Sequence, residues 1–156
     1  MRVLIGIGQR IAKVSVLIRA ISSSDSRKYI VSRVCSVTNI HLVTLNGSTY
    51  NARYDDFKIS DEDSGYKLSL GKFSGNLNEN ALRNGENMKF TTFDRDNDKY
   101  GDGNCAVDYK SGWWYTKCSD CILNAPYGPD LVWWVKTEIK IKEAKMLIRP
   151  KEAMKK

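Results

Sequence analysis

The stretch Phe93-Asp94-Arg95-Asp96-Asn97-Asp98-Lys99-Tyr100-Gly101-Asp102-Gly103-Asn104-Cys105 decides how this chain is interpreted. It places four aspartates within nine positions and ends at a cysteine. Carboxylates this close repel one another, so such a run is either fully solvated or folded around a hard cation that oxygen ligands bind. Calcium is the natural candidate for that cation, and an acidic, solvated turn is the simpler alternative.

The spacing excludes the helix-loop-helix type of calcium loop. That loop needs glycine at its sixth position and glutamate at its twelfth, and counted from Asp94 these positions hold Lys99 and Cys105. What remains is an irregular loop in which aspartate side chains and main-chain carbonyls share the ion. Gly101 and Gly103 would let the chain turn its carbonyls inward.

Short motifs on both sides of the acidic stretch follow one another in a fixed order. They are Asn39–His41, Tyr54–Ile59, Tyr66–Leu68, Phe73–Gly75, Asn84-Gly85 and Phe90–Thr92 upstream, and Cys105-Ala106, Ser111–Cys118, Leu123-Asn124, Tyr127 and Met146–Pro150 downstream. In kind and order they resemble the fibrinogen C-terminal domain, which fibrinogen chains share with ficolins, tachylectins, angiopoietins and tenascins. The resemblance covers residues 39–150 and corresponds to roughly the C-terminal half of the family's domain.

This resemblance implies an α+β fold: an antiparallel sheet with short helices and a large irregular region organised by calcium and a disulfide. It divides the chain into an atypical basic N-terminal segment and linker (1–38), a partial fibrinogen C-terminal domain (39–150) and a basic tail (151–156). The family's N-terminal portion is not recognisable in the first segment. A fragment or a faulty gene model is therefore a further possibility.

The resemblance also implies a set of calcium ligands. The side chains of Asp96 and Asp98 would bind the ion together with the main-chain carbonyls of Tyr100 and Gly103. This chain has one residue more than most relatives between the second aspartate and the cysteine. Counting forward from that aspartate therefore gives Asp102 in place of Gly103, and the choice stays open.

Four cysteines occur, at positions 35, 105, 118 and 121. The spacing Cys118-Ser119-Asp120-Cys121 could serve a redox motif or a zinc site, but zinc would need a second close pair or several histidines. The resemblance implies a disulfide between Cys105 and Cys118, whereas Cys35 and Cys121 have no counterpart in the family. Such a bond persists only in oxidising compartments, so we expect a secreted, extracellular protein.

In lectin-like members of the family, a pocket for acetylated sugars lies beside this disulfide. The resemblance places Tyr109, Cys118 and Ser119 in that pocket. Ser119 stands where those relatives carry histidine, and a later loop of theirs is shortened here to Gly128-Pro129-Asp130. Relatives also hold a cis peptide bond before the second cysteine, which is the bond Lys117–Cys118 in this chain.

The net charge of +7 is unevenly distributed. Residues 1–39 carry seven basic and one acidic side chain, whereas residues 40–156 carry 18 basic and 17 acidic ones. Because the family-like part is nearly neutral, we expect no nucleic-acid partner. Four basic residues interrupt the first 21 positions, which therefore lack the unbroken apolar run of a membrane span or a signal peptide. A surface helix or a strand is one interpretation of these positions, and a mispredicted first exon is the other.

We expect no enzymatic activity. His41 is the single histidine and lies far in sequence from the acidic stretch, and the spacing of Asp96 and Asp98 suits an ion better than a glycosidase. The pairs Trp113-Trp114 and Trp133-Trp134 could stack on sugars. Packing in the core, with their N–H groups hydrogen-bonded, is the stronger expectation.

Turn and strand patterns define the remaining elements. Asn46-Gly47 predicts a hairpin turn, and Asn46-Gly47-Ser48 also matches the N-glycosylation pattern, for which a plain turn is the simpler interpretation. Alternation predicts strands over 41–45, 48–54, 57–59, 66–70, 88–93, 131–134, 139–141 and 146–148, and a short helix over 78–83.

These observations together predict a secreted, calcium-dependent recognition module. The leading prediction is carbohydrate or pattern recognition in innate defence, with an acetylated carbohydrate or a glycoprotein as ligand. The alternative is an extracellular receptor-binding or matrix module that binds proteins and no sugar. The chain contains no collagen-like or coiled-coil tract, so oligomerisation is possible but not encoded in this sequence.

Overall fold

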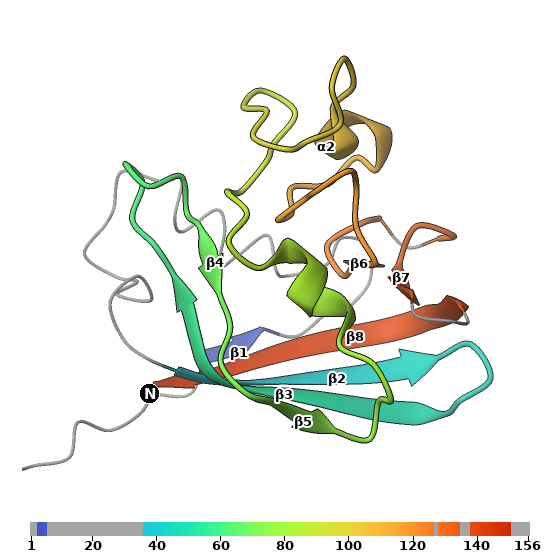
Figure 1. Ribbon diagram of the computed structural model, residues 1–156. Coiled ribbons are helices and arrows are strands. Elements are labelled where there is room, and N and C mark those ends of the chain that lie inside the picture. Colours follow the sequence, from blue (N-terminus) through green and yellow to red (C-terminus); the bar gives the residue numbers. More distant parts are fainter. Residues whose placement is uncertain (1–2, 6–35, 127, 135–137, 151–156) are drawn as a thin grey trace, which may run out of the picture.

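The computed structural model describes residues 3–5, 36–126, 128–134 and 138–150. These residues form a sheet in which every strand pair is antiparallel, together with two short helical turns and long irregular segments (Figure 1). The strands are β1 (Val3–Ile5), β2 (Ser36–Thr44), β3 (Thr49–Ile59), β4 (Leu68–Ser69), β5 (Phe73–Gly75), β6 (Cys121–Ile122), β7 (Val132–Trp134) and β8 (Glu138–Pro150). The helical turns are η1 (Ala81–Gly85) and α2 (Cys105–Asp108). The predicted α+β fold is confirmed.

The sheet has the order β4-β3-β2-β8-β7-β6, with β1 paired to β8 and β5 paired to β3. The predicted hairpin is formed by β2 and β3, which are longer than the sequence pattern indicated. The Gly47 N–H donates to the Thr44 carbonyl at 3.0 Å, and Gly47 has a φ of 86°, a conformation that glycine adopts without steric cost. The predicted antiparallel pairing of the next two segments is present as β3 with β4.

The predicted strand over 88–93 is wrong. The amides of this segment bond to unrelated partners: the Phe90 N–H donates to the Gly65 carbonyl at 2.9 Å and the Thr91 N–H to the Trp113 carbonyl at 2.9 Å. Thr91 and Trp113 form only an isolated bridge. The pattern of buried and exposed residues over 88–93 therefore arises from contacts with two separate loops and not from hydrogen bonding to a neighbouring strand.

Two other boundaries also differ from the sequence pattern. The strands predicted over 139–141 and 146–148 are parts of one strand, β8, which pairs with β2 almost throughout. A register shift between Val43 and Thr44 lies near the end of this pairing, and beyond it Thr44 still pairs with Ile141. The short helix predicted over 78–83 is a 3-10 turn at Ala81–Gly85.

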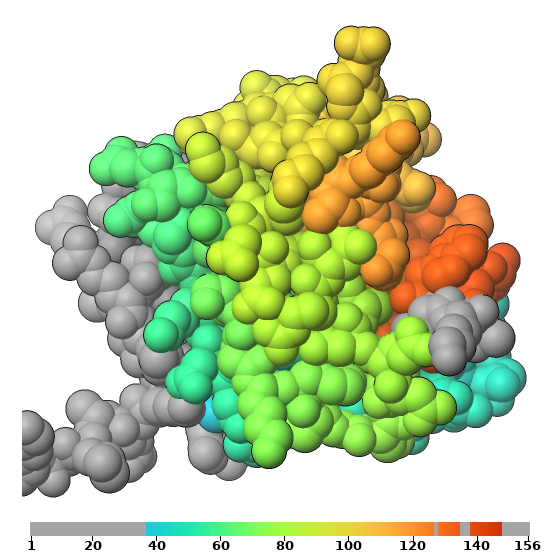
Figure 2. Space-filling view, viewed as in Figure 1, coloured from blue at the N-terminus to red at the C-terminus, as the bar shows by residue number. Residues whose placement is uncertain are grey.

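The core lies between one face of the sheet and the irregular segments that cross it. Figure 1 shows η1 next to the sheet and α2 with the acidic stretch farthest from it, and Figure 2 shows the middle of the chain covering this face. Among the largest fully buried side chains are Ile40, Leu42, Tyr54 and Phe57 from the sheet and Leu82, Trp113, Trp114 and Tyr115 from the covering segments.

The expectation that both tryptophan pairs pack in the core with hydrogen-bonded N–H groups holds in part. Trp113, Trp114 and Trp133 are buried, but Trp134, the last residue of β7, is 54% exposed. The Trp114 indole N–H donates to the Tyr66 carbonyl at 2.8 Å. The N–H group of Trp133 makes no hydrogen bond within the described residues.

The first residues of the chain contribute a strand. Val3–Ile5 pairs with Met146–Ile148 of β8, which matches the strand alternative for these three positions. Residues 6–35, including Cys35, and residues 127 and 151–156 lie outside the described residues. No helix in the described part of the chain is long and apolar enough to cross a membrane.

Candidate functional site

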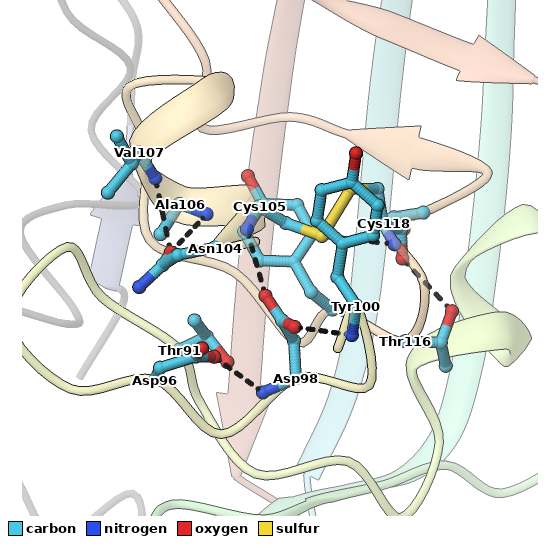
Figure 3. Close-up of a disulfide and its surroundings, with 12 residues drawn as sticks. Thr91, Asp96, Asp98, Tyr100, Asn104, Cys105, Ala106, Val107, Thr116 and Cys118 are labelled. Carbon is cyan, nitrogen blue, oxygen red and sulfur yellow. Dashed lines mark hydrogen bonds between the residues drawn. A yellow bond between two sulfur atoms is a disulfide. The ribbon is translucent and has the colours of Figure 1, made fainter. Parts of the chain in front are cut away.

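A disulfide fixes the base of the acidic stretch. Cys105 and Cys118 are joined, with their Cα atoms 5.4 Å apart, which confirms the predicted pairing (Figure 3). The bond links the first residue of α2 to the segment that leads into β6. The acidic stretch therefore ends at a covalent anchor.

Asn104 connects the same anchor to the start of the stretch. Its side-chain oxygen accepts hydrogen bonds from the N–H groups of Ala106 at 2.8 Å and Val107 at 3.2 Å, so it is the N-cap of α2. Its amide nitrogen donates to the Thr92 carbonyl at 3.2 Å. One side chain therefore begins the helix and holds the two ends of the acidic stretch together.

Asp96 and Asp98 are oriented by the main chain of the stretch. Asp98 accepts the N–H of Tyr100 at 2.8 Å on one carboxylate oxygen and the N–H of Cys105 at 2.9 Å on the other. Asp96 accepts the N–H of Asp98 at 3.0 Å (Figure 3). The chain therefore bends around these two carboxylates, and Asp98 bonds to the N–H of Cys105, where the disulfide begins.

Gly103 lies directly against the ring of Tyr100. A Cβ atom at Gly103 would stand 2.3 Å from two ring atoms of Tyr100, so only glycine fits while the ring keeps this place. Gly101, between them in the same turn, has a φ of 69°. The carbonyls of Tyr100 and Gly103 thus belong to one tight turn beside Asp98. Asp102, the alternative ligand, is exposed in that turn.

Further contacts fasten the stretch to the body of the molecule. The Asn97 side-chain amide donates to the Phe90 carbonyl at 2.7 Å, and the Lys99 N–H donates to the Thr116 carbonyl at 2.8 Å. Asp94 accepts the hydroxyl of its neighbour Thr92 at 2.6 Å. Sequence reasoning missed Asn97 and Asn104; an Asn directly before a short helix was the available signal for the second.

The three residues assigned to the sugar pocket lie around the disulfide. Tyr109 follows α2 and stacks on Tyr115, with ring centroids 6.1 Å apart and an interplanar angle of 24°. The Ser119 hydroxyl donates to the Cys121 carbonyl at 2.9 Å and accepts the Cys121 N–H at 3.3 Å. Ser119 thus uses its hydroxyl on its own backbone. The Lys117–Cys118 bond is trans, in contrast to the cis bond that the resemblance implies.

Apolar side chains are exposed along the acidic stretch and the helix that follows it. Phe93 is 77% exposed, Val107 54% and Tyr100 39%. Thr92, next to Phe93, is tied by Asn104 to the helix that carries Val107. We call Phe93, Tyr100 and Val107 the apolar rim of the acidic loop. Exposed large apolar groups on an anchored loop are typical of an interaction surface.

Comparison with known proteins now defines the family. The model of the C-terminal globular domain of fibrinogen beta and gamma chains matches residues 25–151. The chain belongs to the fibrinogen C-terminal domain family. The match begins upstream of Asn39, in a part of the chain whose structure is not described.

Relatives within this family are moderately similar. Human fibrinogen-like protein 1 is 34% identical over 134 residues, which cover 72% of this chain and 43% of that protein. Human fibroleukin is 35% identical over 138 residues, which cover 74% of this chain and 31% of that protein. The chain spans less than half the length of the curated relatives it matches.

Solved structures agree with this assignment. The fibrinogen-like globe domain of human ANGPTL6 has a TM-score of 0.69 at 31% identity, and the alignment covers 78% of this chain and 59% of that chain. A lamprey fibrin D-dimer, complexed with the peptide ligand Gly-His-Arg-Pro-amide, has a TM-score of 0.69 at 24% identity, covering 80% of this chain and 48% of that chain. The second likeness concerns the fold alone.

The donor set of the acidic loop fits a hard cation by its chemistry. Asp96, Asp98, Tyr100 and Gly103 offer carboxylate and carbonyl oxygens, the ligands that calcium takes in sets of about six to eight. Within the described residues, no three side chains of His, Cys, Asp or Glu gather as a metal-binding group. A cation at this position would therefore need main-chain carbonyls, and water would complete its coordination.

A small cleft lies elsewhere on the surface. Glu79, Asn80, Ala81, Asp120 and Trp134 line a space of about 220 Å³. Asp120 accepts the side-chain amide of Asn84 at 3.0 Å. No sequence motif indicated this cleft, because its residues come from three separate segments of the chain.

Proposed function

We propose that this chain is an extracellular binding module in which calcium and the Cys105–Cys118 disulfide hold the acidic loop, and the apolar rim contacts a protein partner. The observation that carries the proposal is the exposure of Phe93 and Val107, at 77% and 54%, on a segment with fixed ends. Ordering costs on binding are small for a surface that is already held in place. Aromatic and aliphatic anchors of this kind dominate many protein interfaces.

Extracellular location is supported by the disulfide, since a bond of this type persists in oxidising compartments. A binding role, rather than catalysis, is supported by the distribution of side chains. His41 is exposed on β2, where its neighbours are strand residues, and the carboxylates of Asp96 and Asp98 accept hydrogen bonds from their own loop.

Calcium would be held by the carboxylates of Asp96 and Asp98 and the carbonyls of Tyr100 and Gly103. When bound, the ion supplies positive charge that offsets the repulsion between the carboxylates. The main-chain N–H groups that point at Asp98 keep its carboxylate in one orientation, and the ring of Tyr100 covers Gly103. The protein groups thus arrange the site, and the ion would stiffen the segment that carries the rim.

Recognition of acetylated carbohydrate, as in innate defence, is the second candidate. Tyr109 favours it, because this partly exposed residue ends the short helix that begins at the disulfide-bonded Cys105, and its ring could pack on a sugar. The hydroxyl of Ser119 favours the protein-binding candidate, because it is already bonded to its own backbone. The lamprey fibrin structure with its bound peptide is a precedent on the same fold for a peptide ligand.

Calorimetry on the disulfide-bonded protein tests the calcium part of the proposal. Titration with calcium should show saturable binding. The double variant Asp96→Asn with Asp98→Asn should weaken calcium affinity by more than roughly tenfold, because loss of a group that only orients a metal ligand already costs about that much. Asp94→Asn is the matched control and should retain binding, because this aspartate bonds to Thr92. Absence of any calcium-dependent heat in the oxidised protein would remove calcium from the proposal.

Partner class is tested by binding to an array of purified extracellular protein domains in calcium buffer. A partner that uses the rim should lose binding to Phe93→Asp and to Val107→Asp, tested as single changes, and keep binding to Leu45→Asp, which places one carboxylate on the exposed β2–β3 turn. Retention on an N-acetylglucosamine resin, with release by the free sugar and no effect of the rim variant, would instead establish the carbohydrate candidate.

A further inference from the structure

The turn between β2 and β3 contains a serine, Ser48, whose hydroxyl makes no contribution to the hydrogen bonds of the turn. Asn46-Gly47-Ser48 is the chain's only Asn-x-Ser or Asn-x-Thr triplet. A plain hairpin turn explains Asn46 and Gly47 by their conformational preferences. It does not explain the Ser48 hydroxyl, which makes no hydrogen bond to any described residue.

The side chain of Asn46 has a defined orientation. Its Oδ1 accepts the main-chain N–H of Ser48 at 3.1 Å and also the hydroxyl of Thr44. Both bonds go to the oxygen, so the carbonyl faces the turn and the amide nitrogen Nδ2 faces away from it. Within the described residues, Nδ2 has no hydrogen-bond partner. The nitrogen is thus presented on the outside of the turn.

The turn is open to a large reagent. Residues 45–49 are all exposed, and a Cβ atom placed on Gly47 would have no other atom within 4 Å. Leu45, directly before Asn46, is 58% exposed and is one of the few large apolar side chains on the described surface. Figure 1 shows this turn at the end of the β2–β3 hairpin, apart from the acidic loop and α2.

We propose that Asn46 is an N-glycosylation site, a modification that rests on the extracellular location proposed above. The co-substrate is an oligosaccharide linked to a lipid diphosphate. The Asn46 Nδ2 attacks the anomeric carbon of the first sugar and forms the N–C bond, while the C–O bond to the phosphate breaks. The lipid diphosphate departs with the bonding electron pair, and the proton lost by the amide nitrogen passes to a basic group of the enzyme that transfers the oligosaccharide.

The position of the glycan has two consequences. Its first sugars cover Leu45, which reduces the exposed apolar surface at this end of the sheet. The acidic loop and its apolar rim stay uncovered, because the turn and the loop lie at different ends of the molecule (Figure 1). Glycosylation at Asn46 is therefore compatible with binding through the rim.

The test uses the full chain, secreted from eukaryotic cells behind a cleavable leader. Intact mass and peptide mapping should show a glycan on Asn46 that peptide N-glycosidase removes, leaving aspartate at that position. Asn46→Gln and Ser48→Ala should each abolish the added mass, and Ser48→Thr should retain it. Asn51→Gln on β3 is the control, since this asparagine lies outside the pattern and should leave the glycan unchanged.

The outcomes separate this inference from the proposed function. A secreted chain with the Cys105–Cys118 bond and an unmodified Asn46 overturns the glycosylation site and leaves the extracellular module standing. A chain that stays inside the cell with both cysteines reduced overturns the extracellular location and the glycosylation site together. Glycan on the Ser48→Ala variant would also overturn the inference, because the modification would then not follow the pattern.

Discussion

Buried tryptophans of this protein differ in how their indole N–H groups are satisfied. Trp114 donates to the Tyr66 carbonyl, whereas the N–H of Trp133 is equally buried and has no hydrogen-bond partner among the described residues. Removing the Trp114 donor leaves the Tyr66 carbonyl without this bond, whereas removing the Trp133 donor breaks no bond. The two residues thus form a natural comparison of the same side chain with and without its bond.

We expect Trp114→Phe to lower the free energy of unfolding by about 1 to 2 kcal/mol more than Trp133→Phe does. Both changes remove the same volume from a fully buried site, so the cavity contribution is similar. Urea unfolding followed by far-ultraviolet circular dichroism measures the difference. Equal losses in the two variants would mean that the bond to Tyr66 contributes nothing net.

At this scale, the sequence was sufficient where a family motif matches this chain residue by residue. The disulfide between Cys105 and Cys118 followed from the family resemblance, and the structure confirms it. The exposure of Trp134 could not be predicted, because this residue follows two buried residues at the end of a three-residue strand and has no pattern that sets it apart. The inward bonding of Ser119 likewise depends on a turn formed only in the folded chain.

Elements of the sheet depend on close backbone contacts that a sequence pattern does not reveal. Gly75 ends β5, where a Cβ atom would stand 2.1 Å from the main-chain carbonyl oxygen of Asn51, and its φ is 143°. The pairing of Gly75 with Ala52 of β3 brings the two backbones together. A main-chain oxygen in a paired strand cannot move aside as a side chain can.

Gly75→Ala should therefore destabilise the protein by about 2 kcal/mol or more, the usual cost of forcing extra volume into a packed site. Gly47→Ala is the matched control: it also has positive φ, but no atom lies near the added Cβ, so about 1 kcal/mol of backbone strain is expected. Thermal and urea unfolding of unglycosylated protein compare the two. Similar losses would show that β3 and β5 separate easily.

Strand prediction succeeded for elements whose partners are adjacent in the chain. The β2–β3 hairpin and the β3–β4 pair follow from a turn signal between two alternating segments. The segment 88–93 has a similar pattern, but its amides bond to Gly65 and Trp113, which belong to distant loops. Periodicity reports which side of a segment is buried, and it does not report what the backbone bonds to.

The molecule as a whole buries two tyrosines that should make it sensitive to alkali. Tyr54 and Tyr115 are fully buried, and burial is the main cause that raises the pKa of both hydroxyls. In the unfolded chain they ionise near pH 10. Above that pH the folded state holds more protons than the unfolded state, so stability is complete below pH 10 and falls as the pH rises further.

We expect the free energy of unfolding to fall steeply between pH 10 and the pH of alkaline unfolding, with a slope of about 1.4 kcal/mol per pH unit for each such tyrosine. Tyr115→Phe should reduce the slope by about 1.4 kcal/mol per pH unit, the contribution of one tyrosine. This change in slope does not depend on how much absolute stability is lost with the bond to Ser111. Urea unfolding at several pH values, with tyrosinate absorbance, measures this. Ionisation of all tyrosines before unfolding would contradict it.

The buried Cys121 has a consequence for the whole chain. Burial, with the neighbouring charge of Asp120, raises the pKa of its thiol, so almost no reactive thiolate forms in the folded protein. Iodoacetamide can modify this sulfur only when β6 detaches from β7, and the rate of carbamidomethylation then gives the free energy of that local opening. Before β6 docks, however, Cys121 competes with Cys105 for Cys118, so the order of folding and oxidation decides which sulfurs become bonded.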